Sequence, residues 1–175
     1  MKILAIDIGA GTEDVLLYDD AKENIENCIK LVLPSPSLIF AAKIRELTQL
    51  RRDILIKGDI IGGGVFTSSL KKHMKAGHRV IMLEHAAYTV RNNLDDVRTL
   101  GIEITHDAQL VRFEGETLIL EEVNITRLKE FLANFHENLS DVDVVAIAVQ
   151  DHGVSPKDTS NRIARIKKMQ KLLKG

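Results

Sequence analysis

The first twenty residues, MKILAIDIGAGTEDVLLYDD (residues 1–20), decide the expected fold. The apolar run ILAI is typical of a strand that is covered on both faces. Asp7 ends this strand, and Gly9, Gly11 and Thr12 separate it from a second apolar run, VLLY. Glycine lets a backbone turn sharply and lets a ligand approach closely. The stretch therefore predicts a hairpin whose tip offers backbone N–H groups, a hydroxyl group and one carboxylate.

This set of groups suits a phosphate that carries a magnesium ion. The alternative is an ordinary turn, because a Gly-x-Gly pair is most often only a turn. Asp7 and Thr12 favour the phosphate, since a turn requires neither of them.

The composition indicates a soluble globular protein of one domain or two small ones. The chain has 175 residues, of which 45% are hydrophobic and 28% charged. The formal net charge of -1 gives no electrostatic reason to expect nucleic acid or an anionic membrane as a partner. No apolar run approaches the roughly 20 residues of a membrane span. We therefore expect a cytoplasmic protein.

The single cysteine, Cys28, excludes an intrachain disulfide and cannot by itself hold zinc or an iron–sulfur cluster. It lies in a strand-like run, which indicates a buried structural thiol.

The rest of the chain predicts an α/β fold, because strands come first and helices and strands then alternate. The segment PSPS (residues 34–37) stops a third strand, and Ser37 is the expected N-cap of the following helix. Thr67 or Ser68 is expected to cap the next one. The expected strands are 28–33, 53–57, 79–84, 102–105 and 142–149, with a hairpin of 110–113 and 117–121, and the expected helices are 38–52, 67–76, 86–100, 125–135 and 160–174.

A second glycine-rich loop, residues 58–64, follows a short buried strand. Ligands of α/β sheets sit at the carboxyl ends of strands. We therefore expect Gly63 and Gly64 to contact phosphate. The alternative for this loop is a flexible connection.

The long apolar strand near the end of the chain runs into Gln150, Asp151, His152 and Gly153. If this strand lies parallel to the first one, Asp151 comes close to Asp7. Two neighbouring carboxylates repel each other unless a cation lies between them. Asp151 is therefore a candidate for a metal-side or base role. His152 is either a general acid or base or a loop histidine.

Four of the other histidines are expected at the surface, and no pair of them has metal-ligand spacing on a helix. They are His73, His78, His106 and His136.

The stretch LAIDIGAGTEDVLLYD resembles the first phosphate motif of the actin, Hsp70 and sugar-kinase superfamily. The resemblance implies a ribonuclease-H-like lobe with a mixed sheet, formed by residues 1–34 and 124–175. Residues 35–123 would be an inserted α/β subdomain, or the two parts would form one continuous domain.

By position, the same resemblance implies roles for individual residues. Asp7 would hold Mg²⁺ through water, and Gly9, Gly11 and Thr12 would contact the phosphates of ATP. Carbohydrate kinases carry a comparable Gln-x-His-Gly motif, which is matched by the substrate-binding candidates Gln150, His152 and Gly153.

The chain is more closely similar to an uncharacterised prokaryotic family that is often labelled as similar to pyruvate formate-lyase activating enzyme. The similarity rests on IDIGAGTEDVLLYD and AVQDHG. A radical S-adenosylmethionine activase needs three closely spaced cysteines for its cluster, and this chain has only Cys28. The sequence therefore argues against that activity.

Members of the superfamily hold the nucleotide between two lobes, and nothing after Gly153 supplies a second one. The chain would be one lobe of a longer protein, complete a site by self-association, or bind a smaller ligand. The leading hypothesis is an ATP-dependent phosphotransferase or ATPase with Asp7 and Asp151 as catalytic residues.

Two other hypotheses remain. A non-catalytic binding or assembly module is favoured by the missing lobe and by the amphipathic C-terminal helix. A Rossmann dinucleotide site is weaker, because Asp14 stands where its third glycine would fall.

Overall fold

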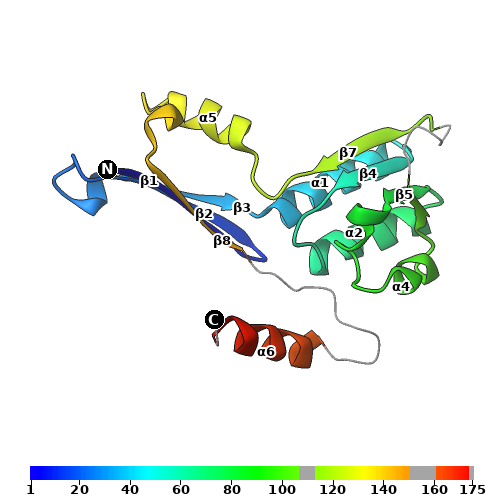
Figure 1. Cartoon of the computed structure of the whole chain (residues 1–175). Helices are drawn as coiled ribbons and strands as arrows, with labels where there is room; N and C mark the ends of the chain where they lie inside the picture. Colours follow the sequence, from blue (N-terminus) through cyan, green and yellow to red (C-terminus); the bar gives the residue numbers. More distant parts are fainter. Residues whose placement is uncertain (107–112, 150–160, 174–175) are drawn as a thin grey trace.

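The computed structural model describes residues 1–106, 113–149 and 161–173 (Figure 1). The chain has a mixed α/β fold with two four-stranded sheets, here called sheet A and sheet B. The α/β class expected from the sequence is confirmed. Among the described helices, none is long and apolar enough to cross a bilayer.

Sheet A is formed by the first three strands of the chain and the last described strand, in the order β3-β2-β1-β8. β1 (Lys2–Ile8) pairs antiparallel with β2 (Thr12–Asp19) and parallel with β8 (Val144–Val149), and β2 pairs antiparallel with β3 (Ile29–Pro34). The predicted hairpin is therefore confirmed. β1 and β8 are also parallel neighbours, which is the condition set by the sequence for bringing Asp151 close to Asp7.

One face of sheet A is covered by α5 (Ile125–Ala133), which lies along the sheet in Figure 1. Leu128 and Leu132 of α5 pack against alternate residues of the sheet, because successive strand residues point to opposite faces. The sheet residues of this core are Leu4, Ile6, Ile8, Val15 and Leu17. Two short 3₁₀ helices, Ile25–Asn27 and Leu139–Asp141, lie in the connections. Cys28 is buried and free, as the sequence predicts.

Sheet B is entirely parallel and has the order β6-β5-β4-β7. Its strands are β4 (Ile54–Gly58), β5 (Val80–Leu83), β6 (Glu103–Thr105) and β7 (Glu116–Leu120). The helices of this part are α1 (Pro36–Gln49), α2 (Gly64–Lys75), α3 (Glu84–Ala87) and α4 (Leu94–Thr99). Their common core includes Ile44, Ile54, Ile56, Phe66, Leu70 and Met82.

The last described helix is α6 (Asn161–Leu172), and it carries an uncovered apolar stripe. Ile163, Ile166, Met169 and Leu173 are all exposed. The helix predicted at this end of the chain is confirmed over these residues.

Some predicted element boundaries are wrong. The single helix expected at 86–100 is split into α3 and α4, because Asn93 caps a new helix by accepting a hydrogen bond from the Asp95 N–H at 2.9 Å. The hairpin partner expected at 110–113 falls almost wholly outside the described residues. The expected hairpin therefore stays a prediction. β7 pairs in parallel with β4, which buries Leu118 and Leu120 in the core of sheet B.

The predicted N-caps are also wrong. Ser35, not Ser37, caps α1, with Pro36 in the first turn, where its missing N–H costs nothing. Gly63, not Thr67 or Ser68, precedes α2 and has a φ of 88°, a value that favours glycine. Both helices therefore begin earlier than expected.

The prediction of a surface position for His73 is wrong, because its side chain is fully buried between α1 and α2. Its Nδ1 atom lies 2.8 Å from the hydroxyl oxygen of Thr48 on α1. Burial lowers the pKa of His73, and the neighbouring His78 lowers it further. The His73 side chain thus packs between the two helices and joins them through Thr48.

The close approach of β4 and β7 gives a test of the fold. Gly58 has a φ of 68°, and a Cβ atom there would lie 2.1 Å from the backbone oxygen of Leu120. Gly77 has a φ of 92°, but no atom lies within 4 Å of its Cβ position. Gly77→Ala should cost roughly 1–2 kcal/mol through backbone strain alone. Gly58→Ala should lower the unfolding free energy clearly more, because β7 must also move. Equal losses in urea denaturation would contradict this packing.

Candidate functional site

The two glycine loops predicted to bind phosphate are both anchored to residues 34–37. The Ser35 hydroxyl donates a hydrogen bond to the Ala10 carbonyl at 3.0 Å, and the Ser35 N–H donates to the Gly11 carbonyl at 3.2 Å. The Ser37 hydroxyl donates to the Ile61 carbonyl at 2.8 Å. The structure therefore brings the hairpin tip and the 58–64 loop to the first turn of α1.

The hairpin tip is tight, and one side of it is open. The Gly9 N–H donates to the Thr12 carbonyl at 2.8 Å, and the Thr12 hydroxyl donates to a carboxylate oxygen of Asp14 at 2.8 Å. No atom lies within 4 Å of the position that a Cβ would take on Gly11. A ligand can therefore approach the backbone at this position.

Asp7 lies beside Asp14, which the sequence analysis did not identify as a site residue. The two residues are cross-strand partners and line the uncovered face of sheet A, opposite α5. Like charges placed directly opposite each other are destabilising, and a cation would relieve this repulsion. The sequence could have predicted this pairing. If Ala10 and Gly11 form a two-residue hairpin loop closed by Gly9 and Thr12, then Asp7 and Asp14 lie opposite each other.

The described residues contain no group of three or more His, Cys, Asp or Glu side chains that could hold a metal ion. Asp7 and Asp14 could therefore hold Mg²⁺ only together with water or with oxygens of a ligand, which is its usual coordination beside phosphates.

The 58–64 loop ends in Gly63 and Gly64, where α2 begins without a side-chain cap. Neither glycine has an atom within 4 Å of its Cβ position. Elsewhere the loop is firmly held: the Ile61 N–H donates to the Glu122 carboxylate at 2.5 Å, and a Cβ on Gly62 would lie 2.2 Å from the Thr89 side chain. The loop thus combines a fixed base with an open end of backbone N–H groups.

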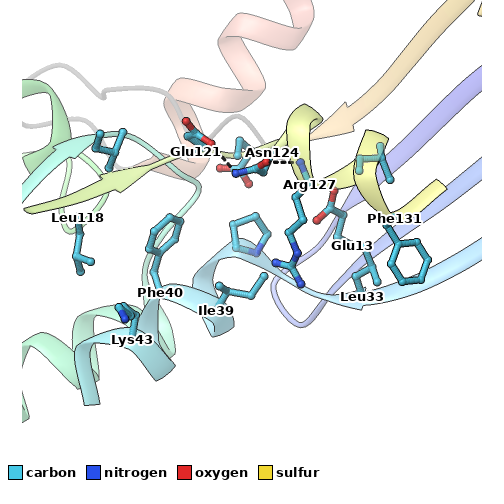
Figure 2. Close-up of a pocket in the computed structure, with 14 residues that line it drawn as sticks. Glu13, Leu33, Ile39, Phe40, Lys43, Leu118, Glu121, Asn124, Arg127 and Phe131 are labelled. Carbon is cyan, nitrogen blue, oxygen red and sulfur yellow. Dashed lines mark hydrogen bonds between the residues drawn. The ribbon is translucent and has the colours of Figure 1, made fainter. Parts of the chain in front are cut away.

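A cavity of about 420 Å³ lies next to these loops, where the chain passes between the two sheets (Figure 2). Figure 2 shows the Arg127 side chain reaching from α5 toward the start of α1, with the Glu13 carboxyl beside it. Glu13 directly follows the hairpin tip and Glu122 holds the 58–64 loop. The cavity is lined by Glu13, Leu33, Pro36, Ile39, Phe40, Lys43, Leu118, Ile119, Glu121, Glu122, Asn124, Arg127, Leu128 and Phe131.

Two carboxyl groups of this cavity are costly to ionise. Burial raises the pKa of Glu13, and the nearby charge of Arg127 opposes this shift. Burial also raises the pKa of Glu122, against the effect of its hydrogen bond from Ile61. The cavity therefore contains acidic groups in a largely apolar setting, a combination typical of binding sites.

Gln150, Asp151, His152 and Gly153 lie outside the described residues, so their roles stay predictions. β8 ends at Val149, which is the parallel partner of Ile8 in β1. The strand that leads to Asp151 is thus a neighbour of the strand that carries Asp7.

Sequence reasoning also missed two exposed pairs at the carboxyl ends of sheet B. His85 Nε2 lies 3.1 Å from Asp59 Oδ1, and His106 Nδ1 lies 2.5 Å from Glu84 Oε2. Asp59 and His106 follow β4 and β6, and Glu84 and His85 begin α3 directly after β5, so only the strand order reveals the pairs.

Residues 61–175 match the model of a protein family described as "Putative pyruvate format-lyase activating enzyme (DUF1786)". This chain belongs to that family. The family likeness expected from the hairpin and AVQDHG motifs is therefore confirmed. The comparison with curated proteins found no match. The chain has one cysteine, Cys28, which cannot by itself hold an iron–sulfur cluster.

The bridging role of Ser35 can be tested by stability measurements. Ser35→Ala removes the helix cap and the bond to Ala10, and should lower the unfolding free energy by about 1–2 kcal/mol. Ser140→Ala removes only an exposed bond to Asp141 and should stay within about 0.5 kcal/mol of the wild type. Equal effects in urea denaturation would show that Ser35 is no anchor.

Two glutamates should respond oppositely to pH. The folded-state pKa of Glu13 is raised above its ordinary value of 4.5, so ionisation of Glu13 lowers the free energy of unfolding as the pH rises above 4.5. Glu13→Gln should therefore be more favourable relative to the wild type at pH 7 than at pH 4. Hydrogen bonds from Lys2 and Lys22 lower the pKa of Glu137, so its contribution is lost as the pH falls below 4.5. Glu137→Gln should destabilise at pH 7 and lose this effect in acid.

Thermal unfolding at several pH values measures both variants. The same sign of pH dependence for Glu13→Gln and Glu137→Gln would contradict this electrostatic description.

Proposed function

We propose that this chain binds the phosphates of a magnesium nucleotide between the hairpin tip and the 58–64 loop. The observation that carries the proposal is the anchoring of both loops by Ser35 and Ser37. Two glycine-bearing loops, predicted separately from the sequence, meet at the start of one helix. Turns of this kind present several N–H groups to one anion.

The individual roles follow from this placement. Asp7 would hold Mg²⁺ through water, with Asp14 beside it. Gly9, Gly11 and Thr12 would contact phosphate, and Gly63 and Gly64 would add N–H groups at the uncapped start of α2, where the helix dipole favours an anion.

A ribonuclease-H-like lobe of the actin-like ATPase type is part of this proposal. It is supported by the β3-β2-β1-β8 order, in which an antiparallel meander is extended by a parallel strand after α5. On this basis the chain would be one lobe of an ATP-dependent phosphotransferase or ATPase. Positioning and charge stabilisation would supply most of the catalysis.

A second candidate function is a non-catalytic binding or assembly module. It is favoured by the uncovered apolar residues of α6 and by β8, whose residues are all exposed. An apolar edge strand of this kind is a template for pairing with another chain. In such a module the phosphate loops would serve a structural purpose.

Thermal unfolding with and without Mg-ATP tests phosphate binding. Ligand at one hundred times its dissociation constant adds roughly 2.7 kcal/mol. Since each kcal/mol moves the midpoint by about 2–4 °C, the wild type should gain roughly 5–11 °C. Asp7→Ala should abolish the gain, whereas Asp96→Ala, at an exposed position of α4, should retain it.

Phosphate release separates the two functions. Turnover of ATP that disappears in Asp7→Ala supports the enzyme, and self-association without turnover supports the module. A midpoint unchanged by ATP, ADP and GTP would remove nucleotides from the proposal.

A further inference from the structure

The cavity in Figure 2 contains a largely buried acid, Glu13. Glu13 is only 9% exposed, and it lines the cavity. Within residues 1–106, 113–149 and 161–173, no hydrogen bond reaches its carboxyl group. A largely buried carboxyl group that faces a cavity is suited to receive a hydrogen bond from a ligand.

Arg127 supplies the opposite charge in the same cavity. Its guanidinium group influences the pKa of Glu13, yet the described structure contains no ion pair between the two side chains. The Arg127 backbone is fixed, because its N–H donates to Asn124 Oδ1 at 2.8 Å and Asn124 in turn donates to Glu121 at 3.0 Å. Arg127 on α5 and Glu13 on β2 thus lie near each other without forming an ion pair in the described structure.

The walls of the cavity are mainly apolar. Leu33 and Ile39 lie near Arg127, and Phe40 and Phe131 stand on the α1 and α5 sides (Figure 2). The volume of about 420 Å³ is within the range of small-molecule sites. A ligand that fills this space needs an apolar body and a polar end that faces Glu13 and Arg127.

The charged residues that line the cavity indicate which polar groups the ligand carries. An anionic group would bind the guanidinium of Arg127, preferably as a carboxylate in a bidentate pair. The hydrogen-bond donor for Glu13 could be a hydroxyl or an ammonium group. Three acidic residues, Glu13, Glu121 and Glu122, line the cavity together with two basic ones, Lys43 and Arg127. An ammonium group suits these carboxyl oxygens better than a hydroxyl group, because it carries three hydrogen-bond donors.

We propose that this cavity binds a free α-amino acid with an apolar or aromatic side chain. The carboxylate of the ligand pairs with Arg127, its ammonium group donates to Glu13, and its side chain packs against Phe40 and Phe131. The site is separate from the phosphate loops, and it requires neither magnesium nor nucleotide.

Titration calorimetry without magnesium or nucleotide tests this proposal with three related probes. L-phenylalanine carries both charges, phenethylamine lacks the carboxylate and 3-phenylpropanoate lacks the ammonium group. L-phenylalanine should bind at least about tenfold more tightly than either of the other two, because each of them leaves one charged residue without a partner. Similar affinity for all three probes would overturn the proposal, since it would indicate an unspecific apolar cavity.

Paired variants locate the site. Glu13→Gln and Arg127→Gln should each weaken L-phenylalanine binding by at least about tenfold. Glu103→Gln and Arg98→Gln remove exposed charges outside the cavity and should leave the affinity unchanged. Unfolding curves in the same buffer show that each variant is folded. Unchanged binding in Arg127→Gln, or no saturable binding of L-phenylalanine, L-leucine and L-methionine up to about 10 mM, would overturn the proposal.

Discussion

The hydrogen bonds of Ser35 are the constraint on which the arrangement of the site depends. This residue is 1% exposed, binds the backbone of Ala10 and Gly11, and caps α1. One side chain thus joins the tip of sheet A to the first helix beside sheet B. Because Glu13 follows the tip and Pro36 follows the cap, the same contacts also help to position two residues that line the cavity. Ser37 extends the connection to the 58–64 loop.

The two sheets provide different environments for chemistry. Sheet B is packed among helices, and the residues after its parallel strands gather at one edge, where ligands of α/β folds sit. In the part of the chain that the structure describes, α5 covers one face of sheet A, and Asp7 and Asp14 are exposed on the other face. The fold therefore separates a charged, open site at the hairpin from a more enclosed, apolar cavity around Glu13 and Arg127.

Local patterns in the sequence predicted the strands and the hairpin, because apolar runs ended by charges or glycines have few other structures. The predictions from local patterns were wrong where side-chain capping or packing between distant segments determines the structure. The helix break at Asn93 depends on a side-chain cap within a run that otherwise looks helical. His73 looked like a polar surface residue, but the packing of α1 against α2 buries it. The cavity was not predictable, since Glu13 and Arg127 are brought together only by the packing of α5 on sheet A. Asp14 could have been found from the hairpin register alone.

The central claim is that the hairpin tip and the 58–64 loop form one phosphate site. Titration of the ¹⁵N-labelled protein with Mg-ATP tests it most directly, because each loop has its own backbone amide signals. The account predicts that the amides of Gly9, Gly11, Gly63 and Gly64 shift together and saturate with a single dissociation constant. Shifts confined to one loop, or different dissociation constants for the two loops, would contradict it.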